Sequence, residues 1–177
     1  MEKWIKLALE MGFTEAAPLD PAALRPLESV RAYCAEEKCG YYGKSWACPP
    51  ACGSLEDCAA RVHAFPKGVL LVTQAHREDE SSFDEIIAVS RRHKARHYAF
   101  AEKMQAALPR VLALGSGGCS LCGTCTYPDA PCRHPDRMVS SLEACGLQVA
   151  DVCRDCGIAY HYSGKTITLA SACLFEE

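Results

Sequence analysis

The 177-residue sequence lacks several features that would assign it to a large class of proteins. No apolar run approaches the roughly 18 residues that a membrane span needs, so we expect no membrane partner. The N-terminal residues lack the apolar core and small-residue cleavage site of a secretory signal. Basic residues are not in excess, with 19 against 22 acidic ones, which argues against nucleic acid as a partner. These absences favour a cytoplasmic globular protein.

Common catalytic motifs are absent as well. The sequence has no P-loop, no G-x-G-x-x-G after a strand, no nucleophile elbow and no H-E-x-x-H. Cys48 and Cys52 have the C-x3-C step of radical enzymes based on S-adenosylmethionine, but the next cysteine is too distant and the chain is too short for their barrel. The sequence therefore predicts no particular reaction and leaves open whether the protein is an enzyme.

Cysteine is the abundant chemistry-bearing residue, with 13 in the chain. The count is odd, and several cysteines are closely spaced, as in Cys122-Gly-Thr-Cys125. Such spacing suits a metal better than a network of structural disulfides. The sequence therefore predicts a reduced, metal-binding protein.

Hydrophobic patterning, N-cap residues and prolines predict both helices and strands. The expected helices cover residues 2–11, 54–65, 82–108 (capped by Ser81 or Ser82) and 140–146, with a short one starting at Asp20 and Pro21. The expected strands cover residues 30–33, 68–73, 111–114 and 166–170. We expect an α/β or α+β fold in one domain, residues 1–177. It would have a small three- to four-stranded sheet, flanking helices and two cysteine-rich metal-binding loops.

The second cysteine-rich loop carries the stronger signal. Two successive C-x-x-C steps wrap three thiolates around one centre, as in the loops of bacterial ferredoxins. Six residues then precede the last cysteine, which departs from the ferredoxin pattern, so that thiolate could close this cluster or reach another. A zinc knuckle is the alternative. The candidate ligands are Cys119, Cys122, Cys125 and Cys132.

The first cysteine-rich loop contains Cys34, Cys39 and Cys48, with Cys52 and Cys58 beyond. A loop rich in glycine, aromatic residues and cysteine is costly to order without a central group, and metal–thiolate bonds would supply one. The alternative is that these cysteines are small core hydrophobes. The residues expected to shield such a group from water and to offset its charge are Tyr41, Tyr42, Trp46 and Lys44.

Both cysteine patterns lie within a longer set of residues that spans nearly the whole chain. The set is Trp4, Gly12, Cys34, Cys39, Gly40, Tyr42-Gly-Lys44, Trp46, Cys48-Pro-Pro50, Gly53, Glu56, Cys58, Cys119, Cys122, Cys125, Cys132-Arg133, Pro135, Ser141, Glu143, Ala144, Gly146 and Val149. In these residues the sequence resembles the predicted metal-binding, cysteine-rich proteins of domain of unknown function 2284. The resemblance implies a single-domain prokaryotic protein with iron–sulfur sites, and it implies no reaction.

Spacing and resemblance together give a ligand hypothesis with two [4Fe-4S] clusters. Cys52 competes with Cys58 at the first cluster; if neither binds, one iron is open to a substrate or a partner's ligand. Cys132 could instead serve the first cluster, and zinc is the alternative metal at both sites. The hypothesis assigns Cys34, Cys39, Cys48 and Cys58 to the first cluster and Cys119, Cys122, Cys125 and Cys132 to the second.

The preferred functional hypothesis is an electron-transfer or accessory redox protein with a redox partner protein. The alternatives are a zinc-binding structural or metal-carrier module and an iron–sulfur enzyme with an open iron at the first cluster. The basic run at residues 91–97 could dock an acidic electron carrier, although a solvated helix face is the favoured interpretation. Cys153 and Cys156 form a C-x-x-C pair that could be a redox dithiol or half of a metal site, although core packing is the favoured interpretation. Cys173 is expected to pack in the core, and Cys145 has no assigned role.

Overall fold

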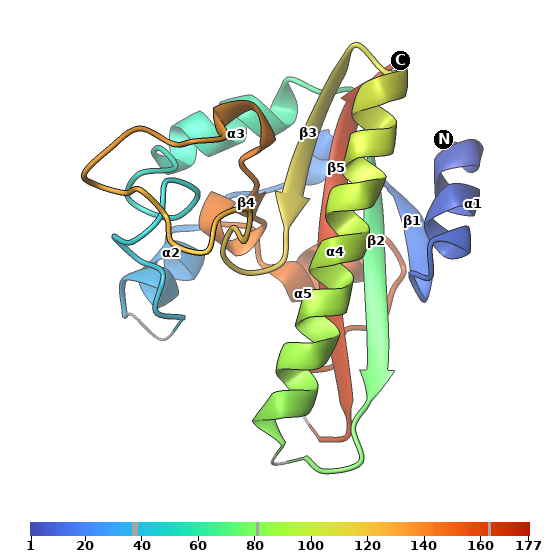
Figure 1. The fold of residues 1–177 in the computed structure, drawn as a ribbon. Helices are drawn as coiled ribbons and strands as arrows, with labels where there is room; N and C mark the ends of the chain where they lie inside the picture. Colours follow the sequence, from blue (N-terminus) through green and yellow to red (C-terminus); the bar gives the residue numbers. More distant parts are fainter. Residues whose placement is uncertain (37–38, 81, 163) are drawn as a thin grey trace.

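The computed structural model describes residues 1–36, 39–80, 82–162 and 164–177. Its centre is a mixed five-stranded sheet with the order β1-β2-β5-β3-β4 (Figure 1). Neighbouring strands are antiparallel except β3 and β4, which are parallel. The expected α+β class is confirmed, but the sheet has five strands and not three to four. The strands are β1 (Glu15–Leu19), β2 (Lys67–His76), β3 (Arg110–Gly115), β4 (Ser140–Ser141) and β5 (Thr166–Glu176).

Strands β2 and β5 are covered on both faces, which explains why most of their side chains are buried, including Thr168 and Ser171 of β5. They pair along the whole of β2, from Lys67 opposite Phe175 to His76 opposite Thr166. Successive side chains alternate between the two faces, so Leu71 belongs to one hydrophobic core and Leu70 to the other. The pair formed by β2 and β5 therefore lies between the two hydrophobic cores and contributes side chains to both.

Helices α1 (Glu2–Glu10) and α4 (Phe83–Ala107) cover one face of the sheet (Figure 1). Trp4 packs edge-on against Phe100 and Phe175, with ring centroids 6.3 and 6.4 Å apart. The N-cap of α4 is Ser82, whose hydroxyl accepts a hydrogen bond from the Glu85 N–H. The other candidate cap, Ser81, lies outside the described residues. The long helix thus begins and ends where the sequence predicted.

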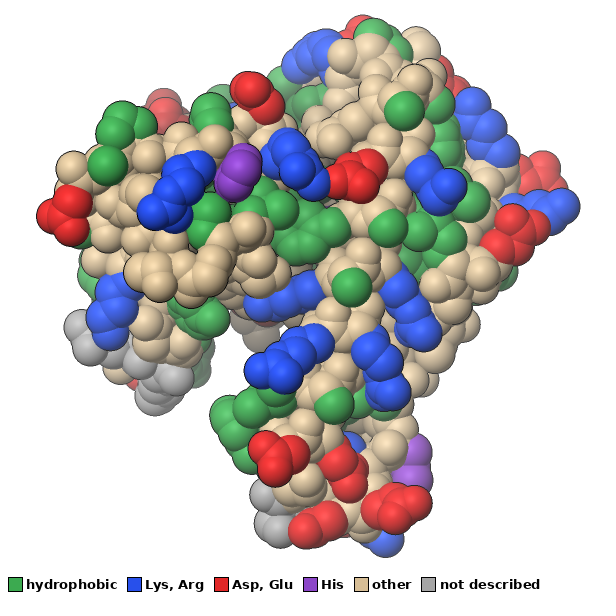
Figure 2. All heavy atoms as spheres, viewed as in Figure 1, with side chains coloured by type: hydrophobic (Ala, Val, Ile, Leu, Met, Phe, Trp, Pro, Cys, Tyr) green, Lys and Arg blue, Asp and Glu red, His purple; other side chains and the backbone are tan. Residues whose placement is uncertain are grey.

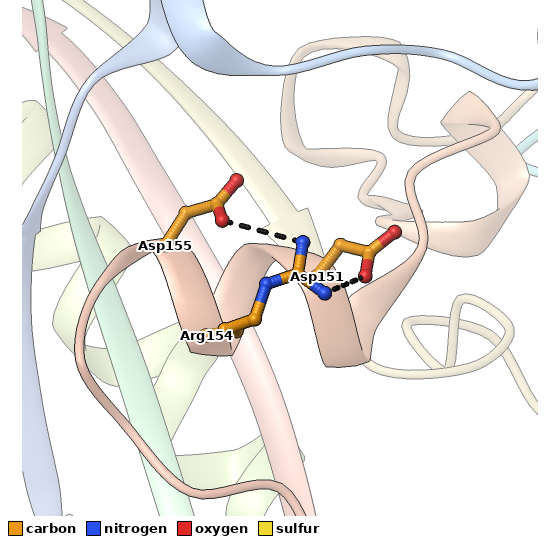
Figure 3. Close-up of polar contacts among 3 residues, drawn as sticks. All are labelled: Asp151, Arg154 and Asp155. Carbon is orange, nitrogen blue, oxygen red and sulfur yellow. Dashed lines mark hydrogen bonds and ion pairs between the residues drawn. The ribbon is translucent and has the colours of Figure 1, made fainter.

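The opposite face is covered by shorter elements. Helix α3 begins with a capping box, in which Ser54 and Asp57 satisfy each other's backbone N–H groups. On α5, Arg154 forms exposed ion pairs with Asp151 at 2.5 Å and Asp155 at 3.4 Å (Figure 3); such exposed pairs contribute at most about 1 kcal/mol. The remaining helical elements are η1 (Pro21–Ala23), α2 (Glu28–Ala35), α3 (Leu55–His63), η2 (Pro135–Arg137), η3 (Glu143–Cys145) and α5 (Val149–Asp155).

Three expectations about local structure were wrong. Residues 30–33 belong to helix α2, because a short apolar run does not distinguish a helix from a strand. Residues 140–146 form β4 and the short turn η3 in place of one helix. Strand β1 was not predicted because Pro18 lies within it; a proline is tolerated there since β1 is an edge strand.

The cysteine-bearing loops lie together at one side of the sheet, beside β4 and beyond the end of β3 (Figure 1). Strand β3 ends at Gly115 and delivers the chain directly into the second loop. In the part of the chain that the structure describes, no helix is long and apolar enough to cross a membrane.

Candidate metal centre

The two cysteine-rich loops are interlocked although they are distant in the sequence. The indole Nε1 of Trp46 donates a hydrogen bond to the carbonyl oxygen of Ala130 at 3.0 Å. The Trp46 ring also packs edge-on against Tyr127, with centroids 4.9 Å apart. At Gly118 a Cβ atom would lie 2.8 Å from the Tyr41 ring, so only glycine permits this approach. These contacts bring the two cysteine sets side by side.

The four cysteines of the second loop line a single cavity, which we call the second cavity. Its volume is about 410 Å³, and the first loop contributes part of its wall, including Lys44 and Trp46. Their positions in the sequence predicted that these two residues serve the first cysteine set; they line the second cavity because the loops interlock. The cysteines of this wall are all half-buried and are Cys119, Cys122, Cys125 and Cys132.

Hydrogen-bond donors point toward sulfur in the second cavity. Burial alone would raise the pKa of Cys125, but hydrogen bonds from the backbone of Tyr127 and Trp46, from the Ser45 hydroxyl and from the Thr126 backbone leave it below the ordinary value. The Tyr98 hydroxyl donates to the Sγ of Cys119 at 3.7 Å. Donors of this kind stabilise a thiolate, which is the form of cysteine that binds metals.

The cysteines of the first loop line a separate cavity, which we call the first cavity. Its volume is about 520 Å³, and its cysteines are Cys34, Cys39 and Cys48. Burial raises the pKa of Cys48 to about 11, with further increases from the neighbouring charges of Cys39, Cys34 and Cys119. The pKa of Cys34 is also raised, first by burial and then by Cys39 and Glu143. Because thiolates repel one another, all three cysteines ionise only when a cation is bound among them.

Lys94 of α4 lines the first cavity, and its charge also acts on a cysteine of the second. Its Nζ donates a hydrogen bond to the carbonyl oxygen of Gly118 at 2.8 Å. Burial lowers the pKa of Lys94, while the charges of Cys119, Cys48 and Glu143 act in the opposite direction. One ammonium group therefore acts on a cysteine from each set, and the two sets lie close enough to share it.

The other two candidate ligands, Cys52 and Cys58, lie outside the walls of both cavities. Together with Cys145 they form a set of buried cysteines, which we call the buried thiol group. Arg31 Nη2 donates to the Sγ of Cys52 at 3.5 Å and to that of Cys58 at 3.4 Å. Hydrogen bonds from Cys145 and Cys52, together with the Arg61 guanidinium, hold the pKa of Cys58 far below its ordinary value. Neither Cys52 nor Cys58 belongs to the wall of the first cavity.

The sequence suggested Lys94 only as part of the basic run at residues 91–97, and it suggested no role at a cysteine set for Glu143 or for the arginines of the buried thiol group. Glu143 belongs to the set of residues that carries the family resemblance, and this was its only signal. Arg31 lies one helical turn before Cys34 on α2, a spacing that places both on one face. The long-range contacts that define these roles leave no mark in local sequence.

The remaining cysteines lie in the hydrophobic cores. Cys153 is fully buried in one core, with Cys156 packed against it, and Cys173 is fully buried in the other. His93 and His97 face the sheet, where they contact Thr73 Oγ1 at 2.9 Å and the Ala172 carbonyl oxygen at 3.2 Å. The core packing expected for these cysteines agrees with their burial.

Among the described residues, no three His, Cys, Asp or Glu side chains surround a point that one metal ion could occupy. The donor sets nevertheless have the chemistry of thiolate ligation: four cysteines around the second cavity and three around the first. The hydrogen-bond donors at sulfur and the single shared ammonium group also suit negatively charged thiolates. The residues present therefore fit a thiolate-held metal group.

Fold and cavities together define a cysteine-rich α+β protein with two thiol-lined sites. The family model described as "Predicted metal-binding protein (DUF2284)" matches residues 17–175. The chain belongs to this family, as its resemblance in the two cysteine motifs suggested. Comparisons with curated proteins and with solved structures gave no match.

Proposed function

We propose that this protein binds two [4Fe-4S] clusters, one in each cavity, and exchanges electrons with a redox partner protein. The observation that carries the proposal is the placement of two separate cysteine sets in neighbouring cavities, with Lys94 acting on both. Clusters of this kind supply one-electron chemistry whose potential depends on charge and on hydrogen bonds to sulfur. Proximity of the two sets favours electron exchange between them.

The arrangement of the cysteines leaves room for clusters. A structural zinc draws four ligands to within about 2.3 Å of one point, but among the described residues no three Cys, His, Asp or Glu side chains surround such a point, and each cysteine set lines part of the wall of a cavity of several hundred Å³. We assign the second cluster to the four half-buried cysteines of the second cavity. We assign Cys34, Cys39 and Cys48 to the first cluster; its fourth ligand is a separate question, because Cys58 lies in the buried thiol group.

The second cavity is the proposed point of contact with the partner. Its cysteines are only half-buried, and the cationic residues Lys44 and Arg133 lie in its wall. On α4, Arg91 and Arg92 are exposed, and Figure 2 shows Lys and Arg side chains gathered along this face of the molecule. Complementary charge raises encounter rates, so we infer that the partner presents an acidic surface.

Metal analysis of protein purified without oxygen tests the proposal. We expect about eight irons and as many acid-labile sulfides per chain, with visible absorbance that a one-electron reductant bleaches reversibly. Cys48→Ser and Cys122→Ser should each lower the iron content by about half, because each removes a ligand of one cluster only. Cys156→Ser is the matched control, since Cys156 packs against the core and lines neither cavity, and it should retain all the iron.

Zinc is the rival outcome. A colourless protein that holds zinc in place of iron and unfolds on chelation would contradict electron transfer and identify a thiolate-stabilised module. Iron in one site only, lost in Cys122→Ser but retained in Cys48→Ser, would restrict the proposal to the second cavity. The two variants therefore test each cavity separately.

A further inference from the structure

Glu143 places a carboxylate in the wall of the first cavity, together with the three cysteines assigned to the first cluster. It is the first residue of the short turn η3, and the charges of Glu143 and Cys34 act on each other. Its Oε2 atom is buried and has no hydrogen-bond partner among the described residues. A buried carboxylate oxygen without a donor is costly, so this atom calls for a partner that the described side chains do not supply.

The carboxylate is held in place by its surroundings. Burial raises the pKa of Glu143, and the neighbouring Ser141 hydroxyl and Gly117 backbone act in the opposite direction. A further hydrogen bond holds the turn that carries Glu143, since Arg31 Nε donates to the Ala144 carbonyl oxygen at 2.7 Å. The positive charge of Lys94 acts on Glu143, but its ammonium group donates its hydrogen bond to the Gly118 carbonyl oxygen and not to this carboxylate. Glu143 is thus an oriented acceptor and not a mobile surface acid.

The cysteines that spacing favoured as fourth ligands are occupied by other contacts. Arg61 Nη2 donates to the Sγ of Cys58 at 2.9 Å, and the Sγ of Cys52 contacts the Ala144 carbonyl oxygen at 3.5 Å. Moving either sulfur into the first cavity would abandon these contacts, and for Cys58 it would also break the hydrogen bonds from Arg31 and Arg61. Glu143 and Cys145 share the turn η3, yet only Glu143 lines the first cavity.

We propose that Glu143, through Oε2, is the fourth protein ligand of the metal cluster held by Cys34, Cys39 and Cys48. This inference rests on the proposed function. Oxygen is a harder ligand than a thiolate and binds a thiophilic iron more weakly, so the iron bound to Glu143 is the exchangeable one. The two clusters then differ in kind: the second is held by four thiolates, and the first has one site at which iron or a ligand can exchange.

The test measures loss and rebinding of one iron in the full-length, anaerobically purified protein. Mild oxidation with ferricyanide should convert one cluster to the [3Fe-4S] form, detected by its EPR signal, with release of one Fe²⁺ and one electron. Added Fe²⁺ should restore it after reduction. Glu143→Ala should weaken this rebinding by at least about tenfold, as loss of a metal-site residue does, and Glu143→Cys should suppress the iron loss.

Controls separate this inference from its rivals. Glu143→Gln keeps the shape of the side chain, so a weakened rebinding there does not depend on a folding defect. Cys58→Ser should lose and rebind iron as the wild type does, although it removes the hydrogen bond from Arg61 and should therefore be less stable to urea. Wild-type rebinding by Glu143→Ala, or an oxidation-labile iron that appears only in Cys58→Ser, would overturn the assignment. Failure of the proposed function is seen earlier and separately, because the wild-type protein would then contain no iron–sulfur cluster.

Discussion

Arg61 and Cys58 form a charged hydrogen bond one turn apart on α3, with Nη2 and Sγ separated by 2.9 Å. The pair lies where Cys52 and Cys145 also meet, and all three cysteines are buried. The pKa of Cys58 is lowered by its hydrogen bonds, while those of Cys52 and Cys145 are raised by their hydrogen bonds to Cys58. Two neighbouring thiols and the guanidinium groups of Arg31 and Arg61 thus favour the thiolate form of Cys58 in this core.

Arg61→Gln should therefore destabilise the protein by about 2 kcal/mol, because a buried thiolate loses a charged donor. Urea unfolding of anaerobically purified protein measures this value. In a double-mutant cycle with Cys58→Ala, the coupling energy should be at least about 1 kcal/mol, since residues in one hydrogen-bond network are not additive. Arg154→Gln is the control: its ion pairs are exposed, so its effect should stay within about 0.5 kcal/mol. Additivity of Arg61→Gln and Cys58→Ala would contradict the charged pair.

Gly146 fixes the turn that carries Glu143, and its replacement should be costly. It has φ of +77°, and a Cβ there would lie 2.4 Å from Leu55 Cδ2 and 3.1 Å from the backbone nitrogen of Leu27. We expect Gly146→Ala to lower the free energy of unfolding by about 2–4 kcal/mol, because backbone strain and overlap add. Gly157 has a similar φ of +74° with nothing within 4 Å, so Gly157→Ala should cost only about 1 kcal/mol. Equal thermal shifts in the two variants would show that overlap at Gly146 is relieved.

Local signals in the sequence were enough to predict several elements and the closeness of the four cysteines of the second loop, whose role as metal ligands stays a prediction. The capping residue Ser54 and the long helix after Ser82 depend on neighbours a few residues away, and both predictions are confirmed. The cysteines of the second loop are close in sequence, so they had to lie near one another in any fold. Strand β1 was missed because its pairing with β2, from Glu15 opposite Val72 onward, is a long-range relationship.

The fourth ligand of the first site shows where sequence spacing stops being informative. Cys58 follows the first cysteines at a plausible distance, but it lies on α3 and contacts Cys145, which is far away in the sequence. Glu143 reaches the first cavity only because β4 pairs in parallel with β3 and places η3 beside the second loop. Tertiary packing therefore decides which side chains share a cavity, and no local pattern reports it.

Lys94 should tune both proposed clusters at once. Removing its positive charge makes the added electron less favourable, so Lys94→Gln should lower both midpoint potentials. The interaction of this unit charge with an electron added to a neighbouring cluster is roughly 1–2 kcal/mol at an effective dielectric constant of about 20. This energy corresponds to tens of millivolts for one electron. Potentiometric titration followed by EPR measures each cluster. Lys103→Gln, an exposed residue of α4 outside both cavities, should leave both potentials unchanged. A shift at one cluster alone would contradict the shared position of Lys94.

The buried histidines of α4 should make the fold less stable in mild acid. Burial lowers the pKa of His93 to about 3 and that of His97 to about 4. Below pH 6.5 the unfolded chain binds protons that the native state does not, so the free energy of unfolding falls as pH falls. The loss between pH 8 and pH 5.5 should be about 1.4 kcal/mol for each histidine.

Comparison of variants isolates this effect from acid damage to a metal site. His93→Gln should lose about half of the histidine contribution, so its stability relative to the wild type should improve by about 1.4 kcal/mol between pH 8 and pH 5.5. His76→Gln is the control, because His76 is exposed, and its stability difference should not change with pH. If the His93→Gln difference were also constant across this range, His93 would have to take up its proton at the same pH in the native state as in the unfolded chain, and its hydrogen bond from or to Thr73 would need to be reassigned.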